Sequence, residues 1–554
     1  MELSSLTLAV LDPRAARLPG MVLEGDTTDS ERGFEIMESW LKHCCETHSL
    51  CQALSARDQG KEGWIPTRLL EFVPGSRPDG DKVRVCERAP SPPAPYATLS
   101  HRWGGKDPIK LQRDNHDQLR LGILISSLPR TFQEAIRTAK RLGITYTWID
   151  SLCIIQDSTE DWMKEAAMMA DVYRYGLLNI SATASENSDG GLYRQRNLNP
   201  RGVMPCALDL RFTGVPHGLY YAVSEALLDG RDVVCQFTDR LRGRRWVFQE
   251  HMLAPRIIHF SDNQFFWQYQ TLEASESCPE GPALTTDSSL VEHMDRPSLR
   301  FLRLSAASQD LCYLWGRIVE EFSDRSLTRK TDRLVAISAI ASEIAKIIPK
   351  TVTYLAGLWS SHLEQMLLWA VMSGSNEQSG VYVAPTWSWA SITGLVSTGH
   401  WRDRFDRLLA RATATVDARM PFGAVSGGKL KLKGCLRKAE VVKRPPDDTI
   451  NIHMFRGRTR HIDRSLTFEG FPGINPRQNR PKLDVEENAI TSFPVYCIPV
   501  LGSGERAYGL LLERIGGPGG PYRRVGIFEG ELWVFMSHND DWVNGSDESE
   551  IEVI

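Results

Sequence analysis

Short apolar runs alternate with amphipathic stretches between residues 96 and 182. Residues 96–100, 144–149 and 177–182 are mostly apolar runs of strand length. The two stretches between them carry apolar residues at helical spacing. These positions are Leu128, Phe132, Ala135, Ile136, Ala139 and Leu142 in the first stretch, and Trp162, Ala166, Met169, Ala170 and Tyr173 in the second. Strands that alternate with helices in this way predict right-handed crossovers and a parallel sheet with helices on both faces.

Residues at the ends of these stretches support the same assignment. Pro129 occupies a favourable first-turn position, and Gly143 follows the last apolar position of the first helix. Ser158 is a suitable N-cap for the second helix, with Asp161 three residues further on. Both predicted helices therefore have a defined beginning.

The N-terminal half reads as a leader followed by an α/β domain. The leader, residues 1–90, contains a helix and a strand pair over 66–73 and 83–86 around a Gly/Pro/Asp turn. The domain, residues 91–280, is the predicted parallel sheet flanked by helices. Polar side chains placed after its strands are candidates for a cleft, because ligands bind at the carboxyl ends of such strands.

The C-terminal half changes character and predicts an α+β region. Residues 281–420 read as mostly helical, with 354–372 as one of the helical stretches. Residues 421–554 read as rich in β-strands, with a disordered insert over 445–488.

Composition places the chain among ordinary globular proteins. Its 554 residues are 42% hydrophobic and 24% charged, with a net charge of −4. No basic excess indicates nucleic-acid binding, no apolar run is long enough to span a membrane, and the N-terminus lacks the features of a signal peptide. These features predict a cytoplasmic or nuclear protein whose 11 cysteines are reduced.

Three segments mix strand-like residues with polar and aromatic side chains. They are residues 96–104 (YATLSHRWG), 148–156 (WIDSLCIIQ) and 245–256 (RWVFQEHMLAPR). In this order they resemble the signature of the fungal heterokaryon-incompatibility (HET) domain, although His101 stands where that family often has Tyr or Phe. The positions that carry the resemblance are Ser100, Arg102, Trp103, Trp148, Asp150, Cys153, Gln156, Trp246, Gln249, Glu250 and Arg256.

The resemblance implies a role in heterokaryon incompatibility, in which fusion of unlike hyphae leads to cell death. It implies a protein partner that is recognised as non-self, and self-association. No ankyrin, WD or nucleotide-sensor motif is evident, so the resemblance is to the stand-alone type. Alternatives are a non-catalytic assembly scaffold, an enzyme that uses the HET-domain cleft, and recruitment of such a gene to secondary metabolism.

The HET family is also considered similar in fold to TIR domains, which implies a TIR/flavodoxin-like sheet. Some TIR domains cleave NAD with a glutamate on a helix, a few residues after a tryptophan. Trp162 and Glu165 resemble that arrangement, which makes Glu165 the candidate catalytic residue and NAD the possible substrate. A carboxylate beside the ribose stabilises the cationic state that forms as nicotinamide leaves. The alternative for Glu165 is an ion pair with a nearby basic residue. No cofactor is otherwise indicated.

Several residues of the signature have both a chemical and a structural interpretation. Asp150 caps the turn after its strand or contacts a ligand. Cys153 is a core thiol or a nucleophile. Arg102 and Arg256 suit anion binding, or they pair with carboxylates in the fold. For the three tryptophans, Trp103, Trp148 and Trp246, core packing is the more common role than cofactor stacking.

The leader contains a spacing that is typical of metal ligands. Cys45, His48 and Cys51 follow one another at intervals of three residues, with His43 and Cys44 beside them. No second Cys/His pair lies nearby in the sequence. We therefore expect no metal site, and these residues to pack inward as small hydrophobic groups.

Overall fold

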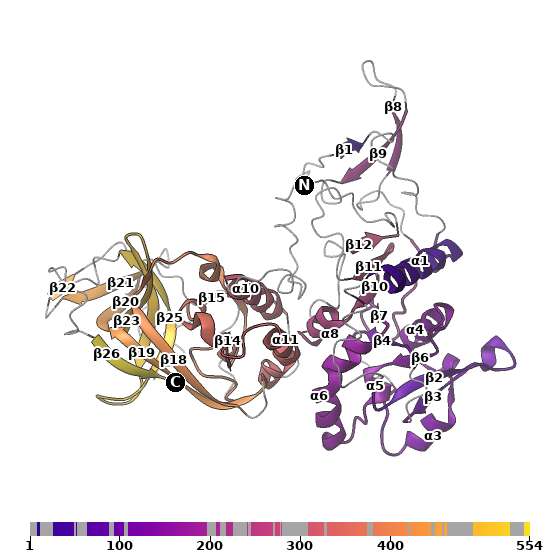
Figure 1. The fold of residues 1–554 in the computed structure, drawn as a ribbon, viewed down its shortest axis with the longest axis horizontal. Helices are drawn as coiled ribbons and strands as arrows, with labels where there is room; N and C mark the ends of the chain where they lie inside the picture. The colour runs from indigo at the N-terminus through magenta and orange to yellow at the C-terminus, as the bar shows by residue number, and fades with distance from the viewer. Residues whose placement is uncertain are drawn as a thin grey trace. The chain divides into compact units, whose positions relative to one another are not determined.

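The computed structural model divides the chain into two compact units, which we describe separately (Figure 1). The first comprises residues 1–243 and 247–296, and the second residues 244–246 and 297–554. The structure describes residues 8–11, 26–48, 51, 64–87, 94–104, 109–196, 206–210, 218–224, 241, 245–269, 272–276, 279, 309–325, 330–373, 381–418, 422–444, 449–456, 459–461, 491–531 and 548–554.

The first unit is built on a nine-stranded mixed sheet of order β12-β11-β10-β7-β4-β6-β2-β3-β5. Its centre, β10-β7-β4-β6, is parallel, and antiparallel strands extend it on both sides. The predicted α/β fold and its parallel strands are confirmed. The strands are β2 (Leu69–Val73), β3 (Lys82–Cys86), β4 (Tyr96–Ser100), β5 (Ile123–Leu124), β6 (Tyr146–Trp148), β7 (Leu178–Ser181), β10 (Arg256–Phe260), β11 (Phe265–Tyr269) and β12 (Leu272–Ser275).

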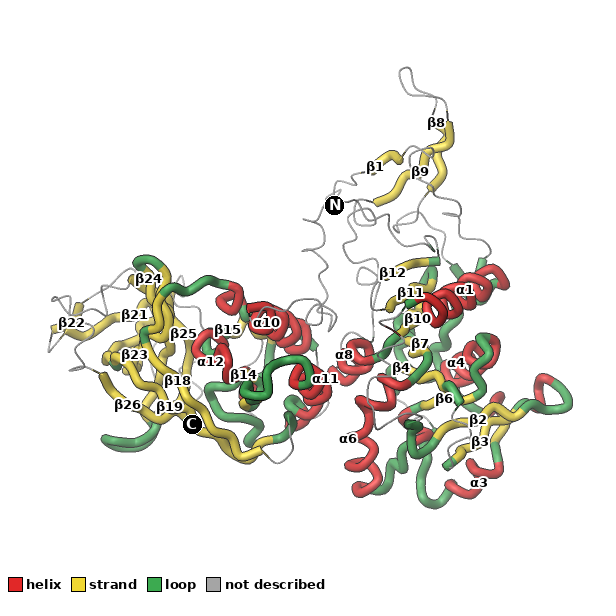
Figure 2. Tube along the Cα trace, viewed as in Figure 1, coloured by secondary structure: helices red, strands yellow, loops and turns green. Residues whose placement is uncertain are grey.

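Strand β4 is the point at which the direction of chain progression reverses. The chain passes from β4 to β6 on one side, and then to β7 on the other side of β4. Because parallel crossovers are right-handed, the helices after β4 and β6 must cover opposite faces of the sheet. Figure 2 shows α4 (Arg130–Arg141) on one side of these strands and α6 (Thr159–Tyr175) on the other. A reversal of this kind opens a crevice at the carboxyl ends of the strands.

The predicted helix boundaries are confirmed, but the inward face of α6 differs from the prediction. Ser158 Oγ accepts a hydrogen bond from Asp161 N at 3.3 Å, and Gly143 ends the α4 segment with φ of 79°. Trp162 lies outward with an exposed fraction of 36%, whereas Glu165 is buried with Val172 and Tyr173. Glu165 lies inside because it pairs with the buried Arg68. The apolar pattern of the sequence cannot reveal such a partner.

The helix of the leader packs on the same sheet as the α/β domain. Helix α1 (Glu31–Thr47) places the Trp40 ring 5.7 Å from Phe265 and 5.8 Å from Trp267. The predicted pair β2–β3 is confirmed, and β2 also pairs with β6. Residues on both sides of position 90 therefore build one sheet.

Other elements of the first unit are shorter or lie apart from this sheet. Strands β1 (Leu8–Leu11), β9 (Gly218–Ser224) and β8 (Cys206–Leu210) form a separate antiparallel sheet. The remaining helices are η1 (Pro78–Gly80), α3 (His116–Leu121), η2 (Ile125–Ser127), α5 (Asp150–Cys153) and α8 (Arg245–Leu253).

The second unit combines helices with a ten-stranded sheet, as the predicted α+β region requires. The sheet order is β18-β19-β26-β25-β24-β23-β20-β21-β22, and β17 pairs with β23. The last strand, β26, pairs with β19, and ion pairs such as Lys433 with Glu548 link the two strands. The strands are β17 (Arg407–Leu408), β18 (Ala410–Ala418), β19 (Val425–Cys435), β20 (Arg437–Arg444), β21 (Thr449–Arg456), β22 (Thr459–His461), β23 (Thr491–Ser503), β24 (Arg506–Arg514), β25 (Tyr522–Glu531) and β26 (Glu548–Val553).

Two expectations for the second unit need comment. Within the expected disordered insert at 445–488, residues 449–456 and 459–461 form strands, and the rest of the insert lies outside the described residues. The predicted helix over 354–372 is wrong. A tight turn with positive φ at Ala356 and Gly357 breaks it, and the carbonyl of Gly357 accepts Nε1–H bonds from Trp315 and Trp389.

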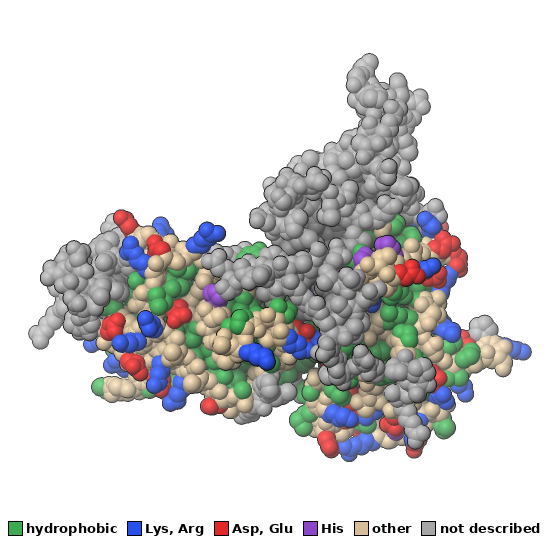
Figure 3. Space-filling view, in the orientation of Figure 1, with side chains coloured by type: hydrophobic (Ala, Val, Ile, Leu, Met, Phe, Trp, Pro, Cys, Tyr) green, Lys and Arg blue, Asp and Glu red, His purple; other side chains and the backbone are tan. Residues whose placement is uncertain are grey.

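Short elements replace that helix, while two longer helices flank the region. The segment contains β13 (Tyr354–Leu355), β14 (Leu358–Trp359), η5 (Ser360–His362), α12 (Leu363–Met366) and β15 (Ala370–Ser373). The other elements of the unit are α10 (Gln309–Ser323), η4 (Lys330–Asp332), α11 (Val335–Ala345), η6 (Trp389–Ser391), β16 (Leu395–Ser397) and η7 (Gly399–Arg402). On the face in Figure 3, basic and acidic side chains of the described residues are interspersed.

Candidate functional site

The candidate site is a buried polar cluster at the carboxyl end of β4. Ser100, the last residue of β4, is fully buried, and its hydroxyl donates to the Glu250 carboxylate from α8. Asn179 of the adjacent strand β7 donates from Nδ2 to Ser100 Oγ at 3.0 Å. Tyr173 of α6 completes the cluster with hydrogen bonds to Glu250 and Ser100. A buried carboxylate is thus surrounded by hydroxyl groups, which is the arrangement that makes burial of its charge tolerable.

The environment of Tyr173 shows how enclosed the cluster is. Burial raises the pKa of Tyr173 well above its usual value, and the nearby charges of Glu250 and Asp150 act in the same direction. Tyr173 therefore remains a neutral hydrogen-bonding group at physiological pH.

A second row of polar groups follows the ends of β7 and β10. Ser181 Oγ lies 3.1 Å from His251 Nε2, and Thr183 Oγ1 lies 3.3 Å from His259 Nδ1. The rings of His251 and His259 meet edge to face at 5.0 Å. His259 Nε2 in turn lies 3.0 Å from Gln268 of β11. Helix α8 therefore supplies Glu250 to the first cluster and the neighbouring His251 to this second row.

Asp150 lies after β6 as the first residue of α5, and its carboxylate contacts the first signature segment. Its Oδ1 accepts from Ser151 N at 2.7 Å at the start of α5, and its Oδ2 accepts from Trp103 Nε1 at 2.9 Å. His101 Nδ1 lies 3.9 Å from the same carboxylate. Gln156 closes the segment, because its Nε2 donates to the carbonyl of Asp150 at 3.1 Å. The first and second signature segments are therefore linked through one aspartate.

Other signature residues lie in the core or at the surface. Trp148 is fully buried and meets Tyr173 edge to face at 5.8 Å. Burial raises the pKa of Cys153 to about 12, so this thiol stays protonated at neutral pH. Arg102 is exposed, and Trp246 is partly exposed. Gln249 is buried.

Glu165 lies in an internal ion-pair network of α6 and the leader. It has an exposed fraction of 1%, with Oε1 3.8 Å from Arg68 Nη1. Arg68 also forms a two-pronged pair with Asp161, which contacts it at 2.7 and 3.0 Å. Burial raises the pKa of Glu165, opposed by a hydrogen bond from Thr67 and the charge of Arg68. These contacts match the ion-pair alternative for Glu165, and they do not join it to the cluster at Ser100.

Arg256 is also buried rather than presented to a ligand. Its Nε donates to Cys44 Sγ at 3.1 Å and its Nη1 to the carbonyl of Leu177 at 3.3 Å. Among the leader residues with metal-like spacing, His48 stacks on Tyr269, with the ring centroids 4.4 Å apart. Within the described part of the chain, no three His, Cys, Asp or Glu side chains gather in a way that could hold a metal ion.

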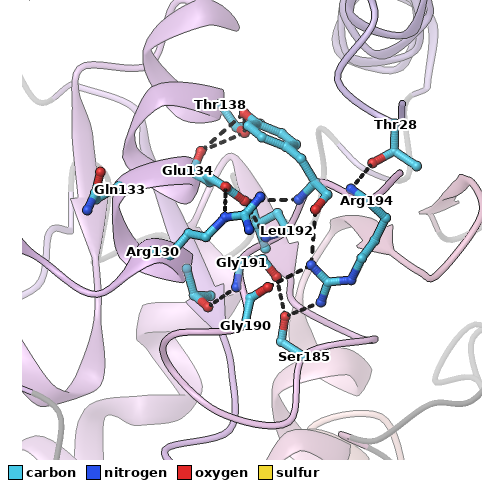
Figure 4. Close-up of polar contacts among 12 residues, drawn as sticks. Thr28, Arg130, Gln133, Glu134, Thr138, Ser185, Gly190, Gly191, Leu192 and Arg194 are labelled. Carbon is cyan, nitrogen blue, oxygen red and sulfur yellow. Dashed lines mark hydrogen bonds and ion pairs between the residues drawn. The ribbon is translucent and has the colours of Figure 1, made fainter. Parts of the chain in front are cut away.

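The loop after β7 is fixed by the polar network in Figure 4. Glu134 of α4 accepts from the backbone N–H groups of Leu192 and Tyr193 at 2.5 and 2.9 Å, and from Arg130 Nε at 2.6 Å. Further along, Arg194 donates from Nη2 to Ser185 Oγ at 3.0 Å. The segment that leaves the carboxyl end of β7 is thereby anchored to the helix that covers the sheet.

The structure thus unites a set of residues that the sequence suggested only in part. Ser100 and Glu250 lie in the first cluster, and Trp103, Asp150 and Gln156 lie beside it. The sequence did not single out Tyr173 as a polar group, nor Asn179, Ser181 and His259. The available signal was polar residues within the buried runs 177–182 and 256–260, which require partners.

The parallel strands, their reversal at β4 and the buried cluster that α8 joins define the class as an α/β domain. Residues 96–250 match the family model described as Heterokaryon incompatibility protein (HET). Residues 96–250 therefore form a HET domain, and the match is confined to that part of the chain. No curated protein and no solved structure matches the chain. Among the described residues, the helices are too short or too polar to cross a membrane.

Proposed function

We propose that this protein acts in heterokaryon incompatibility, with its HET domain as the effector that leads to cell death. The observation that supports this is the family match over residues 96–250, whose first and last segments meet at the Ser100–Glu250 hydrogen bond. On this proposal, the trigger is contact with a protein partner from an unlike strain, and the response requires self-association of the chain.

The cluster, rather than Glu165, is the part of the domain on which the proposal depends. Glu250 connects α8 to the ends of β4 and, through Tyr173, to α6. A change in its charge therefore acts on three elements of the domain at once. Glu165 instead contacts Arg68, which lies just before β2.

The test is inducible expression of the full chain in a filamentous fungus, with growth and viability measured in single strains and after fusion of unlike strains. We expect the wild type to arrest growth, and Glu250→Gln to abolish the arrest at equal protein level. Glu160→Gln is the matched control, because Glu160 is exposed in the first turn of α6. A well-expressed wild type without any effect on viability in either setting would overturn the proposal.

The same cultures distinguish an assembly mechanism from NAD hydrolysis. Cellular NAD and released nicotinamide are measured for the wild type and for Glu165→Ala. Arrest without NAD loss supports assembly. NAD loss that Glu165→Ala removes, with the protein still folded by circular dichroism, supports the enzymatic alternative.

A further inference from the structure

Strand β26 is paired along its whole length on one side and at a single residue on the other. All of its residues, Glu548–Val553, pair with β19 in the antiparallel direction (Figure 1). On the opposite side, β25 reaches only Val553, which lies beside Tyr522. Among the described residues, no strand pairs with the remainder of that side. Residues 548–551 therefore form a free edge, here called the β26 edge, and such an edge is a template for a further strand.

The hydrogen bonds at the end of the strand show which backbone groups this edge presents. Ile554 N donates to the carbonyl of Tyr522 at 2.9 Å, on the side away from β19. Because the direction of the N–H groups alternates along a strand, the N–H groups of Glu550 and Glu548 point to this same side. The carbonyl of each residue points in the same direction as its N–H group. Glu548 and Glu550 therefore offer an N–H donor and a C=O acceptor each to an incoming strand.

The side chains of β26 give the edge one sign of charge. Glu548, Glu550 and Glu552 lie on the outer face of the sheet, and the Glu550 side chain has an exposed fraction of 64%. Each has one lysine partner on β19, with Nζ–Oε distances of 3.1 Å for Lys433–Glu548, 3.8 Å for Lys431–Glu550 and 3.1 Å for Lys429–Glu552. The inner face carries Ile551 and Val553, which are buried. The strand thus alternates between exposed acidic and mostly apolar positions.

These glutamates select the kind of strand that can pair with the edge. Like charges directly opposite one another destabilise a cross-strand pair, which disfavours an acidic strand and also β26 of a second copy. A carboxylate has two oxygens and accepts several hydrogen bonds, so each glutamate can contact a second cation besides its lysine on β19. Exposed ion pairs contribute little affinity. The backbone hydrogen bonds would therefore hold the strand, and the charges would determine its identity.

We infer that the β26 edge is a docking site for an extended segment of another protein, with lysine or arginine at alternate positions and apolar residues between them. The chain itself contains a segment of this kind: residues 428–434 read GKLKLKG, and 430–434 of these pair with the other side of β26. The basic side chains of the partner lie over the glutamates, and its apolar side chains lie beside Ile551, because successive side chains of a strand alternate between the faces.

The opposite end of the sheet provides an internal control. Strand β18 is the terminal strand on the other side of β19. Its exposed side chains beside the lysines of β19 are Arg411, Thr413, Thr415 and Asp417. This edge lacks a row of carboxylates, so it does not select a basic strand. Asp417 is therefore the position at which one negative charge can be removed from the same face without changing the β26 edge.

The test measures binding of a fluorescent GKLKLKG peptide to the full-length protein by fluorescence anisotropy. We expect saturable binding that weakens as the salt concentration rises, and no binding of the acidic peptide GELELEG. Glu550→Gln should weaken binding about two- to fivefold, because one exposed ion pair is lost. Asp417→Asn is the matched control and should leave binding unchanged. Equal losses in the two variants, or equal binding of both peptides, would overturn the inference.

Two N-methylated peptides determine whether GKLKLKG adds as a strand at this edge. In the expected antiparallel pairing, the N–H groups of the lysines that lie over the glutamates point to β26, and those of the leucines point away. Methylation of the central lysine N–H should weaken binding about tenfold or more, and methylation of a leucine N–H should not. The reverse result would show that the peptide replaces β19 and would refute docking at the free edge. So would equal binding of the two methylated peptides, or no saturable binding of GKLKLKG to the wild type.

Discussion

At the scale of single residues, the interior of the HET domain depends on a tyrosine that appears apolar by position. Tyr173 packs against Trp148, while its hydroxyl group reaches Glu250 and Ser100. A buried carboxylate that loses one of its donors keeps the full cost of its desolvation. The hydroxyl group therefore matters more to this fold than the ring contact by itself suggests.

Tyr173→Phe should lower the free energy of unfolding by about 1–3 kcal/mol, because Glu250 loses a buried hydrogen-bond donor while the ring remains. Tyr175→Phe is the control on the same helix, since Tyr175 is only partly buried, and it should change stability by less than about 0.5 kcal/mol. Urea unfolding followed by circular dichroism measures both. Equal effects of the two variants would contradict the assigned role of the hydroxyl group.

In the second unit, the buried Arg524 is a charged group whose hydrogen-bonding capacity is only partly satisfied. The Arg524 guanidinium lies 3.5 Å from the ring centroid of Trp369 and donates from Nη2 to the carbonyl of Trp369. Its Nε and Nη1 have no hydrogen-bond partner among the described residues. Burial lowers the pKa of Arg524 well below its usual value. The cation–π contact offsets only part of this desolvation.

Arg524→Met should therefore be neutral or stabilising, within about 1–2 kcal/mol, because an apolar chain of similar length removes a buried charge without an acidic partner. The neighbouring Arg523 pairs with Glu513 at the surface, so Arg523→Met should cost at most about 1 kcal/mol. Thermal unfolding compares the two variants with the wild type. A large loss of stability in Arg524→Met alone would show that the guanidinium has an anionic partner.

At the scale of elements, one carboxylate anchors a loop to a helix. Glu134 on α4 satisfies the backbone N–H groups of Leu192 and Tyr193 beyond β7 (Figure 4). The neighbouring Gly191 has φ of 74°, and a Cβ there would lie 2.8 Å from the side chains of Arg130 and Glu134. The loop follows this path because glycine permits both the backbone conformation and the close approach.

Glu134→Ala should destabilise the first unit by roughly 2–5 kcal/mol, because two buried N–H groups lose their acceptor. Arg137→Ala, an exposed position on the same helix, should have an effect below about 0.5 kcal/mol. Hydrogen exchange of the Leu192 and Tyr193 amides reports the same contact locally. Unchanged protection of these amides in Glu134→Ala would refute the anchoring role.

At the scale of the whole molecule, one ion pair gives the stability of the chain a dependence on pH. Arg196 and Glu276 are both buried and form an ion pair between the loop after β7 and the end of β12. Burial raises the pKa of Glu276 to about 7, and the charge of Arg196 opposes this only in part. The folded state therefore binds this proton more tightly than the unfolded state does.

The contribution of Glu276 to stability is present below its unfolded pKa of 4.5 and is lost as pH rises toward about 7. The change is on the order of 3 kcal/mol at most. Glu276→Gln cannot ionise, so the difference in unfolding free energy between it and the wild type should shift in favour of the variant from pH 5 to pH 8. A difference that is constant across this range would show that Glu276 titrates normally.

Local patterns in the sequence were sufficient to predict much of the first unit. The alternation of strands and helices, the Ser158 cap and the stop at Gly143 all depend on neighbours within one helical turn or one strand. Where long-range partners intervene, the same reasoning fails. Glu165 lies inward because of Arg68, and the predicted helix over 354–372 is broken at a turn that tryptophans from other segments stabilise.

By itself the sequence determined the α/β class, the positions of three of the four parallel strands along the chain, and the HET resemblance, because these depend on periodicity and on short motifs. Only the tertiary structure decided which polar groups meet. Ser100 and Glu250 are 150 positions apart, and Cys44 and Arg256 are 212 positions apart. Contacts of such separation arise from the packing of helices on the sheet, and a buried donor takes whichever acceptor that packing brings within reach.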